Sequence, residues 1–206
     1  MFIVIEGLDG SGKSTAGKQL AEELHSRFHK KIQLTHEPNK DYCGGDYIRA
    51  VLGKKITAFH PRVLPLSFAA NRLDHCARLV QPCLDAGQIV ISDRYYLSSL
   101  VYQSSEDFPF EKVMEINEKA LKPDLIFFLN VSNEVCYERM SIRNEPEELF
   151  ESRLDDYRKK YISAIEFLRN VRGDFIVEID GNGTVAETVG QMVEAVEAFD
   201  RTSRNS

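Results

Sequence analysis

Residues 7–15 read Gly7-Leu8-Asp9-Gly10-Ser11-Gly12-Lys13-Ser14-Thr15. This run matches the pattern of a glycine, four residues and Gly-Lys-Ser/Thr, in which a glycine-rich loop wraps around phosphate groups. The residues before it, 2–5, are all apolar and predict a short buried strand, while residues 16–24 carry apolar side chains at helical spacing. Strand, glycine loop and helix is the context that the pattern requires. The sequence therefore predicts a loop that binds a nucleoside triphosphate.

Each part of this loop has a physical task. The three glycines let the backbone curl so that successive N–H groups point inward, and the N-terminus of the following helix adds its partial positive charge. Lys13 can reach the outer phosphates, and the hydroxyl of Ser14 can ligate a magnesium ion. We therefore expect ATP to be bound by Gly7, Leu8, Asp9, Gly10, Ser11, Gly12, Lys13, Ser14 and Thr15.

Length and composition limit the class of protein. The chain has 206 residues, a net charge of −6 and 43% hydrophobic residues, which suits one soluble domain and argues against a polymeric nucleic acid partner. No apolar run approaches the 18 residues of a membrane span, and residues 2–5 are too short for a signal peptide. The four cysteines show no paired metal spacing: Cys43, Cys76, Cys83 and Cys136. Reduced thiols in a cytoplasmic protein are the plain interpretation.

Strands and helices alternate along the chain. Short apolar runs predict strands over residues 2–5, 32–35, 88–92, 125–129 and 175–179. Helical patterns cover residues 16–24, 47–52, 64–86, 110–121 and 185–199, with a further helix that ends at 169. This alternation predicts an α/β fold, a five-stranded parallel sheet with helices on both faces. We expect one domain over residues 1–200 and a polar, disordered tail over residues 201–206.

The third predicted strand ends in Asp93-Arg94-Tyr95, at the sheet edge where ligands bind in such folds. An aspartate there can help to hold the magnesium ion that Ser14 contacts. Arg94 supplies a forked, permanently charged donor for phosphate. An ordinary surface ion pair is the alternative interpretation. Because Asp93 and Arg94 are expected opposite the phosphate-binding loop, a site for metal and phosphate is the favoured interpretation.

With their neighbours, these residues carry a family resemblance. The chain resembles thymidylate kinases of the bacterial type, members of the nucleoside monophosphate kinases with a phosphate-binding loop. The resemblance rests on residues 2–15, Thr35-His36-Glu37-Pro38, Ile48-Arg49, Phe68-Ala69-Ala70-Asn71-Arg72, Asp93-Arg94-Tyr95, Ser98-Ser99-Leu100-Val101-Tyr102-Gln103, Lys122-Pro123-Asp124-Leu125, Arg139 and Arg143. It implies transfer of the γ-phosphoryl group of ATP to thymidine monophosphate (dTMP), giving the diphosphate (dTDP) and ADP. It also implies a magnesium requirement and a homodimer.

The resemblance also implies a set of residues for the acceptor nucleotide. They are Asp9, Glu37, Arg49, Phe68, Arg72, Arg94, Ser99, Tyr102 and Gln103. Arg49 and Arg94 would hold the acceptor phosphate, and Asp9 would bond the 3′-hydroxyl of the sugar. Phe68 would stack on thymine while Arg72, one helical turn later, bonds the base edge.

The remaining acceptor residues would line the base and sugar. Tyr102 would pack under the sugar and disfavour a 2′-hydroxyl, and Ser99 and Gln103 would line the base pocket. For Phe68 the alternative is an ordinary core position, because aromatic residues on long helices are most often core. For Gln103 the alternative is an exposed polar side chain.

The position of the catalytic arginine follows from the loop composition. In the family, that arginine lies either inside the phosphate loop or in a mobile lid. The loop here has none at its variable positions, 8–11. The lid is expected over about residues 132–148, where Arg139 and Arg143 are four apart and share one face if the segment is helical. A lid arginine can stabilise the transition state, so the expected catalytic residues are Lys13, Arg94, Arg139 and Arg143.

The chain departs from the family pattern in the loop after the second predicted strand and in the predicted lid. His36 stands where an arginine is usual, and Asn39-Lys40-Asp41 precedes the glycines at 44 and 45. The path of this loop, and with it the role of Glu37, is left open by the sequence. The lid is also less rich in arginine than in many relatives, which leaves the assignment between its two arginines open.

Rival functions differ from this one at identifiable residues. A deoxynucleoside kinase, in which a glutamate acts as base toward a 5′-hydroxyl, usually has a glutamine on the long helix. Residues 64–80 contain none, and Asp93-Arg94-Tyr95 stands where that class tends to have Glu-Arg-Ser. A switch GTPase would need Asn-Lys-x-Asp after a later strand, and Asn39-Lys40-Asp41 lacks the spacer. A non-catalytic nucleotide-binding module remains an alternative that motifs do not exclude.

Overall fold

A parallel sheet at the centre of the molecule carries the site. The computed structural model describes residues 1–143, 149 and 154–204. Within these residues the strands are β1 (Phe2–Gly7), β2 (Ile32–His36), β3 (Ile89–Asp93), β4 (Leu125–Asn130) and β5 (Ile176–Asp180). They lie in the order β2-β3-β1-β4-β5, and every neighbouring pair is parallel. The predicted α/β fold with a five-stranded parallel sheet is confirmed.

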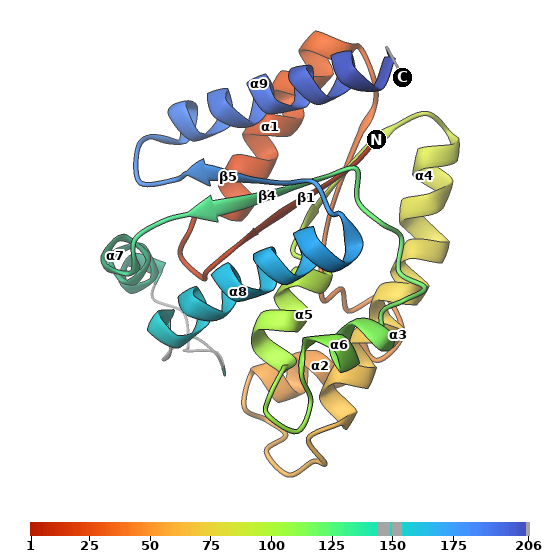
Figure 1. Ribbon diagram of the computed structural model, residues 1–206, viewed down its shortest axis with the longest axis vertical. Helices are drawn as coiled ribbons and strands as arrows, with labels where there is room; N and C mark the ends of the chain where they lie inside the picture. Colours follow the sequence, from red (N-terminus) through yellow and green to blue (C-terminus); the bar gives the residue numbers. More distant parts are fainter. Residues whose placement is uncertain (144–148, 150–153, 205–206) are drawn as a thin grey trace.

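Helices cover both faces of this sheet. In the described part of the chain they are α1 (Lys13–Phe28), α2 (Gly45–Leu52), α3 (Val63–His75), α4 (Gln81–Asp85), α5 (Tyr96–Gln103), α6 (Phe110–Glu115), α7 (Asn133–Arg143), α8 (Leu154–Arg172) and α9 (Val185–Arg204). Helices α1 and α9 pack together on one face, and α5 and α8 pack on the other (Figure 1). Helices α2, α3 and α6 lie beyond α5, and α7 lies beside the carboxyl ends of β4 and β5. None of the described helices combines the length and apolar composition needed to cross a membrane.

The core explains why β1 is central. Every residue of β1 is buried, and the strand lies between β3 and β4. Burying one aliphatic side chain stabilises a fold by about 1.5–3 kcal/mol, so the apolar run before the glycine loop belongs where both faces are covered. A smaller cluster of Ile48, Val51, Leu52 and Leu64 joins α2 to α3, and Phe68 packs against it. This cluster packs α2 against α3.

The helix predicted over residues 64–86 consists of three segments. Helix α3 is followed by a π-helical segment, Cys76–Val80, and then by α4. In the π-helical segment the N–H of Gln81 donates to the carbonyl of Cys76, five residues back. Pro82 comes next and has no N–H to continue the usual ladder, which accounts for the wider turn that precedes it.

Two other helix ends and one whole helix differ from the sequence prediction. The helix predicted to reach residue 121 ends at Glu115, because the side chain of Asn117 donates to the carbonyl of Val113 at 2.7 Å and competes with the backbone ladder. Helix α5 was not among the predicted helices. The polar tail expected from residue 201 is helical through Arg204, since no glycine or proline after residue 190 interrupts α9.

The sheet brings distant residues to one edge. The strands all point the same way, so β1 ends at Gly7, β2 at His36 and β3 at Asp93 on the same side of the molecule. The glycine loop follows β1 directly, and α7 lies beside it (Figure 1). Ligands bind beyond this carboxyl edge in sheets of this kind. Helix α7 occupies the first part of the predicted lid, whereas residues 144–148 lie outside the described residues.

Candidate active site

The glycine loop joins β1 to α1 and closes around its own lysine. Gly10 and Gly12 have φ angles of +81° and +90°, which glycine adopts without steric cost. A Cβ on Gly10 would lie 2.4 Å from a backbone oxygen of α7, so a side chain is also excluded by contact. Nζ of Lys13 donates to the carbonyls of Gly7 and Leu8, at 3.0 Å and 2.7 Å, and burial lowers the pKa of this lysine. The result is a backbone cradle with a buried amine at its centre.

The residues predicted to hold a metal ion lie side by side. Oγ of Ser14, in the first turn of α1, donates to Oδ2 of Asp93 at 2.5 Å. Both are hard oxygen donors of the kind that Mg²⁺ takes, alongside water and substrate phosphates. Among the described residues, there is no group of three or more His, Cys, Asp or Glu side chains that could hold a metal ion. The donor set therefore fits an ion that arrives with a phosphate ligand better than a resident protein-enclosed metal.

Arg94 reaches back across the glycine loop. Its φ angle is +71°, a left-handed conformation that a non-glycine residue adopts at a cost and that recurs at functional sites. Nη1 donates to the carbonyl of Gly7 at 3.2 Å and to Oγ of Ser98 at 3.0 Å, while Nη2 forms a short ion pair with the carboxylate of Asp9. The guanidinium carbon lies 5.2 Å from the centre of the Tyr102 ring. Residues predicted for the acceptor phosphate and sugar thus face each other.

One pocket of about 420 Å³ brings together residues that the sequence predicted for the donor and for the acceptor nucleotide. Of the predicted site residues, its lining includes Asp9, Gly10, Gly12, Lys13, Ser14, Glu37, Arg49, Phe68, Arg72, Asp93, Arg94, Ser99, Tyr102 and Gln103. Gly7, Leu8, Ser11 and Thr15 belong to the loop but do not line this pocket. The side of the pocket opposite the glycine loop, called the acceptor wall below, is formed by residues of α2, α3 and α5. These helices are far from the glycine loop in sequence.

Two polar atoms of this wall have no partner within the described protein. Oγ of Ser99 and Oε1 of Gln103 are buried, and neither forms a hydrogen bond among the described residues. Both side chains line the pocket from α5. A buried polar group without a partner costs about 1–3 kcal/mol, a cost that a hydrogen bond to a bound polar ligand would remove.

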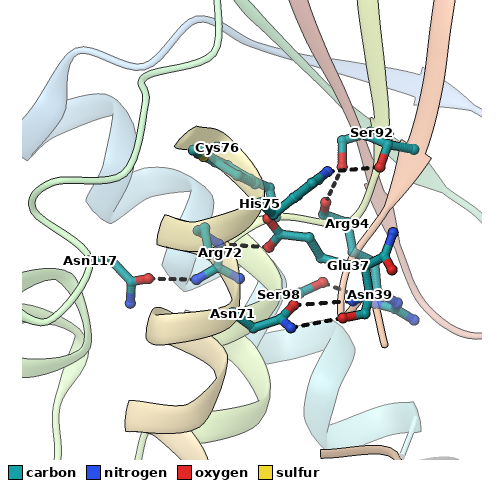
Figure 2. Close-up of polar contacts among 12 residues, drawn as sticks. Glu37, Asn39, Asn71, Arg72, His75, Cys76, Ser92, Arg94, Ser98 and Asn117 are labelled. Atoms are coloured by element: carbon teal, nitrogen blue, oxygen red, sulfur yellow. Dashed lines mark hydrogen bonds and ion pairs between the residues drawn. The ribbon is translucent and has the colours of Figure 1, made fainter. Parts of the chain in front are cut away.

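Arg72 is buried and fixed on two sides (Figure 2). Nε donates to Oε2 of Glu37 at 2.7 Å, and Nη1 donates to Oδ1 of Asn117 at 2.5 Å. The other carboxylate oxygen of Glu37 is bonded to Nδ1 of His75 at 3.0 Å. Glu37 thus lines the pocket with both of its oxygens engaged by protein groups.

The comparison with known proteins decides the family. A family model described as thymidylate kinase matches residues 5–192. The chain belongs to the thymidylate kinase family. A probable thymidylate kinase of Thermococcus kodakarensis is 35% identical over 203 residues, covering 87% of this chain and 97% of that protein. A thymidylate kinase of Mesomycoplasma hyopneumoniae strain J is 36% identical over 206 residues and covers 97% of both chains, while a probable thymidylate kinase of Staphylothermus marinus is 34% identical over 99% of this chain.

Membership of the thymidylate kinase family decides between the functions that the sequence left open. The relatives named above are all described as thymidylate kinases, and each matches most of this chain. The enzyme is therefore a thymidylate kinase rather than a deoxynucleoside kinase or a non-catalytic nucleotide-binding module.

The two arginines predicted for the lid, Arg139 and Arg143, lie on α7. Arg139 donates from Nη1 to the carbonyl of Ser11 at 3.3 Å and from Nη2 to the carbonyl of Gly181 at 3.2 Å. It therefore links the phosphate loop to the segment after β5. Arg143 is the last residue of α7, and its side chain lies outside the described part of the structure.

The segment after β2, whose path the sequence left open, is fixed by α3. Oδ1 of Asn71 accepts from the N–H of Asn39 at 3.1 Å, and its Nδ2 donates to the carbonyls of Asn39 and Cys43, at 2.8 Å and 3.0 Å. Arg49 donates to the carbonyl of Pro38 at 3.1 Å. The buried amide of Asn71 therefore holds this loop at Asn39 and Cys43 (Figure 2).

Glu6 is a supporting residue that the sequence analysis did not single out. Its Oε1 accepts from the N–H groups of Tyr95 and Ser98, at 2.8 Å and 3.1 Å, and its Oε2 accepts from Oγ of Ser98 at 2.6 Å. Burial raises the pKa of Glu6, and the positive charge of Arg94 opposes that rise. Glu6 thus caps the N-terminus of α5, the helix that supplies much of the acceptor wall. Its signal in the sequence was a lone acid at the end of an apolar strand.

Proposed function

We propose that this thymidylate kinase transfers the γ-phosphoryl group of ATP to dTMP through the residues of this single pocket. The bond between the γ-phosphorus and the β,γ-bridging oxygen breaks, and a bond to a phosphate oxygen of dTMP forms, giving ADP and dTDP. The observation that carries the proposal is the shared pocket, in which a phosphate-binding loop faces a wall with a stacking ring, an arginine and unpartnered polar atoms. Such a site aligns two polyanions and neutralises their charge.

The donor end is assigned to the glycine loop. Backbone N–H groups of residues 7–15 and the N-terminus of α1 would hold the phosphates of ATP. Lys13, which bonds two loop carbonyls in the structure, would move its three donors to the β- and γ-phosphates. Arg94 would bridge to the acceptor phosphate from the opposite side.

Magnesium is proposed as the metal ion of the reaction. Ser14 and Asp93 would hold it, directly or through water, together with phosphate oxygens. Held by these two residues, Mg²⁺ would supply positive charge to the phosphate oxygens during the transfer. The 2.5 Å approach of the two side-chain oxygens supports this pairing.

The acceptor end is assigned to α2, α3 and α5. Phe68 would stack on thymine, and Tyr102 would pack under the sugar whose 3′-hydroxyl bonds Asp9. Arg49 would join Arg94 on the phosphate. Ser99 and Gln103 would supply the polar atoms that are unpartnered in the protein.

The deciding experiment compares two acceptors. With ATP and Mg²⁺, dTMP is expected to yield dTDP, whereas thymidine is expected to yield no thymidine monophosphate, because the site is built for an acceptor phosphate. Removal of Mg²⁺ with a chelator should reduce dTDP formation to background. Products are separated by anion-exchange chromatography. Phosphorylation of thymidine, or full activity in the chelator, would contradict the assignment of the acceptor or of the metal.

Arg72→Ala is expected to raise the KM for dTMP and to weaken the preference for dTMP over dCMP by roughly tenfold. Thymine presents a carbonyl acceptor where cytosine presents an amino donor, and a guanidinium can only donate. The two kcat/KM values are measured with the variant and the parent. An unchanged ratio would show that Arg72 does not read the base.

We further propose that the chain is a homodimer that acts in the cytoplasm. Leu66 and Leu73 are seven residues apart on α3 and are 52% and 50% exposed, so both side chains are available for contact with a second copy. The four cysteines are all free, which suits a reducing compartment. We also propose a single domain over residues 1–200.

A further inference from the structure

The guanidinium of Arg72 is held by buried side chains from two distant segments. Glu37 lies just after β2 and bonds Nε, while Asn117 lies just after α6 and bonds Nη1. The exposed fractions of Arg72, Glu37 and Asn117 are 2%, 5% and 3%. Figure 2 shows the two partners on opposite sides of the guanidinium. Because neither bond competes with water, rotation of the guanidinium would leave buried polar atoms without partners.

Each of the two partners is itself held in place. The carboxylate of Glu37 accepts from Nδ1 of His75 at 3.0 Å, and Nε2 of His75 bonds Oγ1 of Thr35 at 2.8 Å. On the other side, Nδ2 of Asn117 donates to the carbonyl of Val113 at 2.7 Å. The orientation of the guanidinium is therefore determined by the protein before any ligand is bound.

This arrangement leaves one guanidinium nitrogen for a ligand. Two of the three nitrogens of Arg72 are engaged by Glu37 and Asn117, and Nη2 forms no hydrogen bond among the described residues. The side chain lines the pocket, with its guanidinium carbon 5.1 Å from the centre of the Tyr95 ring. A fixed N–H of this kind can donate to a carbonyl oxygen on the base but cannot bond an amino group, which is itself a donor.

We propose that Asn117 is a positioning residue for base discrimination. It holds Arg72 in the orientation that reads the base and does so without touching the nucleotide, while Glu37 holds the other side. Within the described residues Asn117 is absent from the pocket lining, so it acts through Arg72. The inference rests on the proposed function, because it takes Arg72 as the residue that contacts the base. A donor oriented in advance gains discrimination because its ordering cost is met by the fold rather than by binding.

The test is a double-mutant cycle between Asn117 and Arg72. Asn117→Ala is expected to raise the KM for dTMP and to lower the dTMP-over-dCMP preference, each by roughly tenfold, with kcat and the KM for ATP within about twofold of the parent. In the Arg72→Ala background, Asn117→Ala should change neither KM nor preference further. The kcat/KM values for both acceptors are measured in all four proteins, with thermal unfolding of each as a check on folding.

Asn117→Asp separates positioning from local structure. Aspartate keeps an oxygen for Nη1 of Arg72 but cannot donate to the carbonyl of Val113, so both variants lose the local bond and only alanine loses the contact with Arg72. Asn117→Asp is expected to keep the parent's preference for dTMP. If Asn117→Ala does not fold, Asn117→Ser takes its place, since its hydroxyl is one bond shorter and falls short of Nη1.

The possible results distinguish failure of the role proposed for Arg72 from failure of the role proposed for Asn117. If Arg72→Ala leaves the preference unchanged, the role of Arg72 in the proposed function fails, and the inference fails with it. If Arg72→Ala relaxes the preference but Asn117→Ala does not, only the inference fails. Additive effects in the double variant, or an aspartate variant as relaxed as the alanine variant, would also overturn positioning through Arg72.

Discussion

Lys13→Ala is expected to reduce phosphoryl transfer by on the order of a thousandfold or more while leaving the fold intact. Lys13 contributes its amine rather than an apolar surface, and its bonds in the structure go to two loop carbonyls. Alanine removes the positive charge that would neutralise the β- and γ-phosphates as the bond between them breaks. The turnover number is measured at saturating ATP, dTMP and Mg²⁺.

A second lysine provides the control for this variant. Lys119 is an exposed residue, 79% accessible at its side chain, whose ion pair is with neighbouring Glu118. Lys119→Ala makes the same chemical change at an exposed residue outside the pocket lining and should retain the parent's turnover. Circular dichroism and thermal unfolding should show both variants folded. A folded Lys13→Ala enzyme with near-normal turnover would rule out the proposed role of the loop lysine.

The features that sequence alone predicts are those encoded within a short window. The apolar run before Gly7, the glycines of the loop and the helical pattern after it together specify strand, loop and helix, and the structure has these elements in this order. The meeting of Ser14 with Asp93 was also predictable, because parallel strands end at one edge of the sheet and both residues follow strands there. In both cases the local sequence pattern and the parallel topology predict the same arrangement.

What the sequence could not supply depends on contacts between distant segments. The support of α5 comes from Glu6, whose carboxylate meets the backbone of Ser98 across 92 positions. The fixed orientation of Arg72 comes from Glu37 and Asn117, 35 and 45 positions away. No periodicity or spacing rule connects such residues, because their proximity is a product of the complete fold. For the same reason the role of Glu37 stayed open until its partners were known.

Arg143→Ala is expected to lower the turnover number by on the order of a hundredfold, and by more than it raises the KM for ATP or dTMP. A lid arginine contacts the transferring phosphoryl group most strongly as charge is redistributed in the transition state. Its loss therefore appears in the chemical step rather than in binding. Single-turnover measurements with rapid quenching isolate that step from product release.

Arg139→Ala is the matched variant, one helical turn earlier on α7. Its guanidinium bonds the carbonyls of Ser11 and Gly181, so it anchors the phosphate loop to the segment after β5. Removing an anchor loosens the ATP site, and we expect a rise in the KM for ATP of roughly tenfold with a smaller loss of single-turnover rate. If Arg139→Ala loses the single-turnover rate and Arg143→Ala does not, the two roles are exchanged. If neither variant loses it, catalysis by a lid arginine is wrong for this enzyme, and charge neutralisation falls to Lys13, Arg94 and the metal ion.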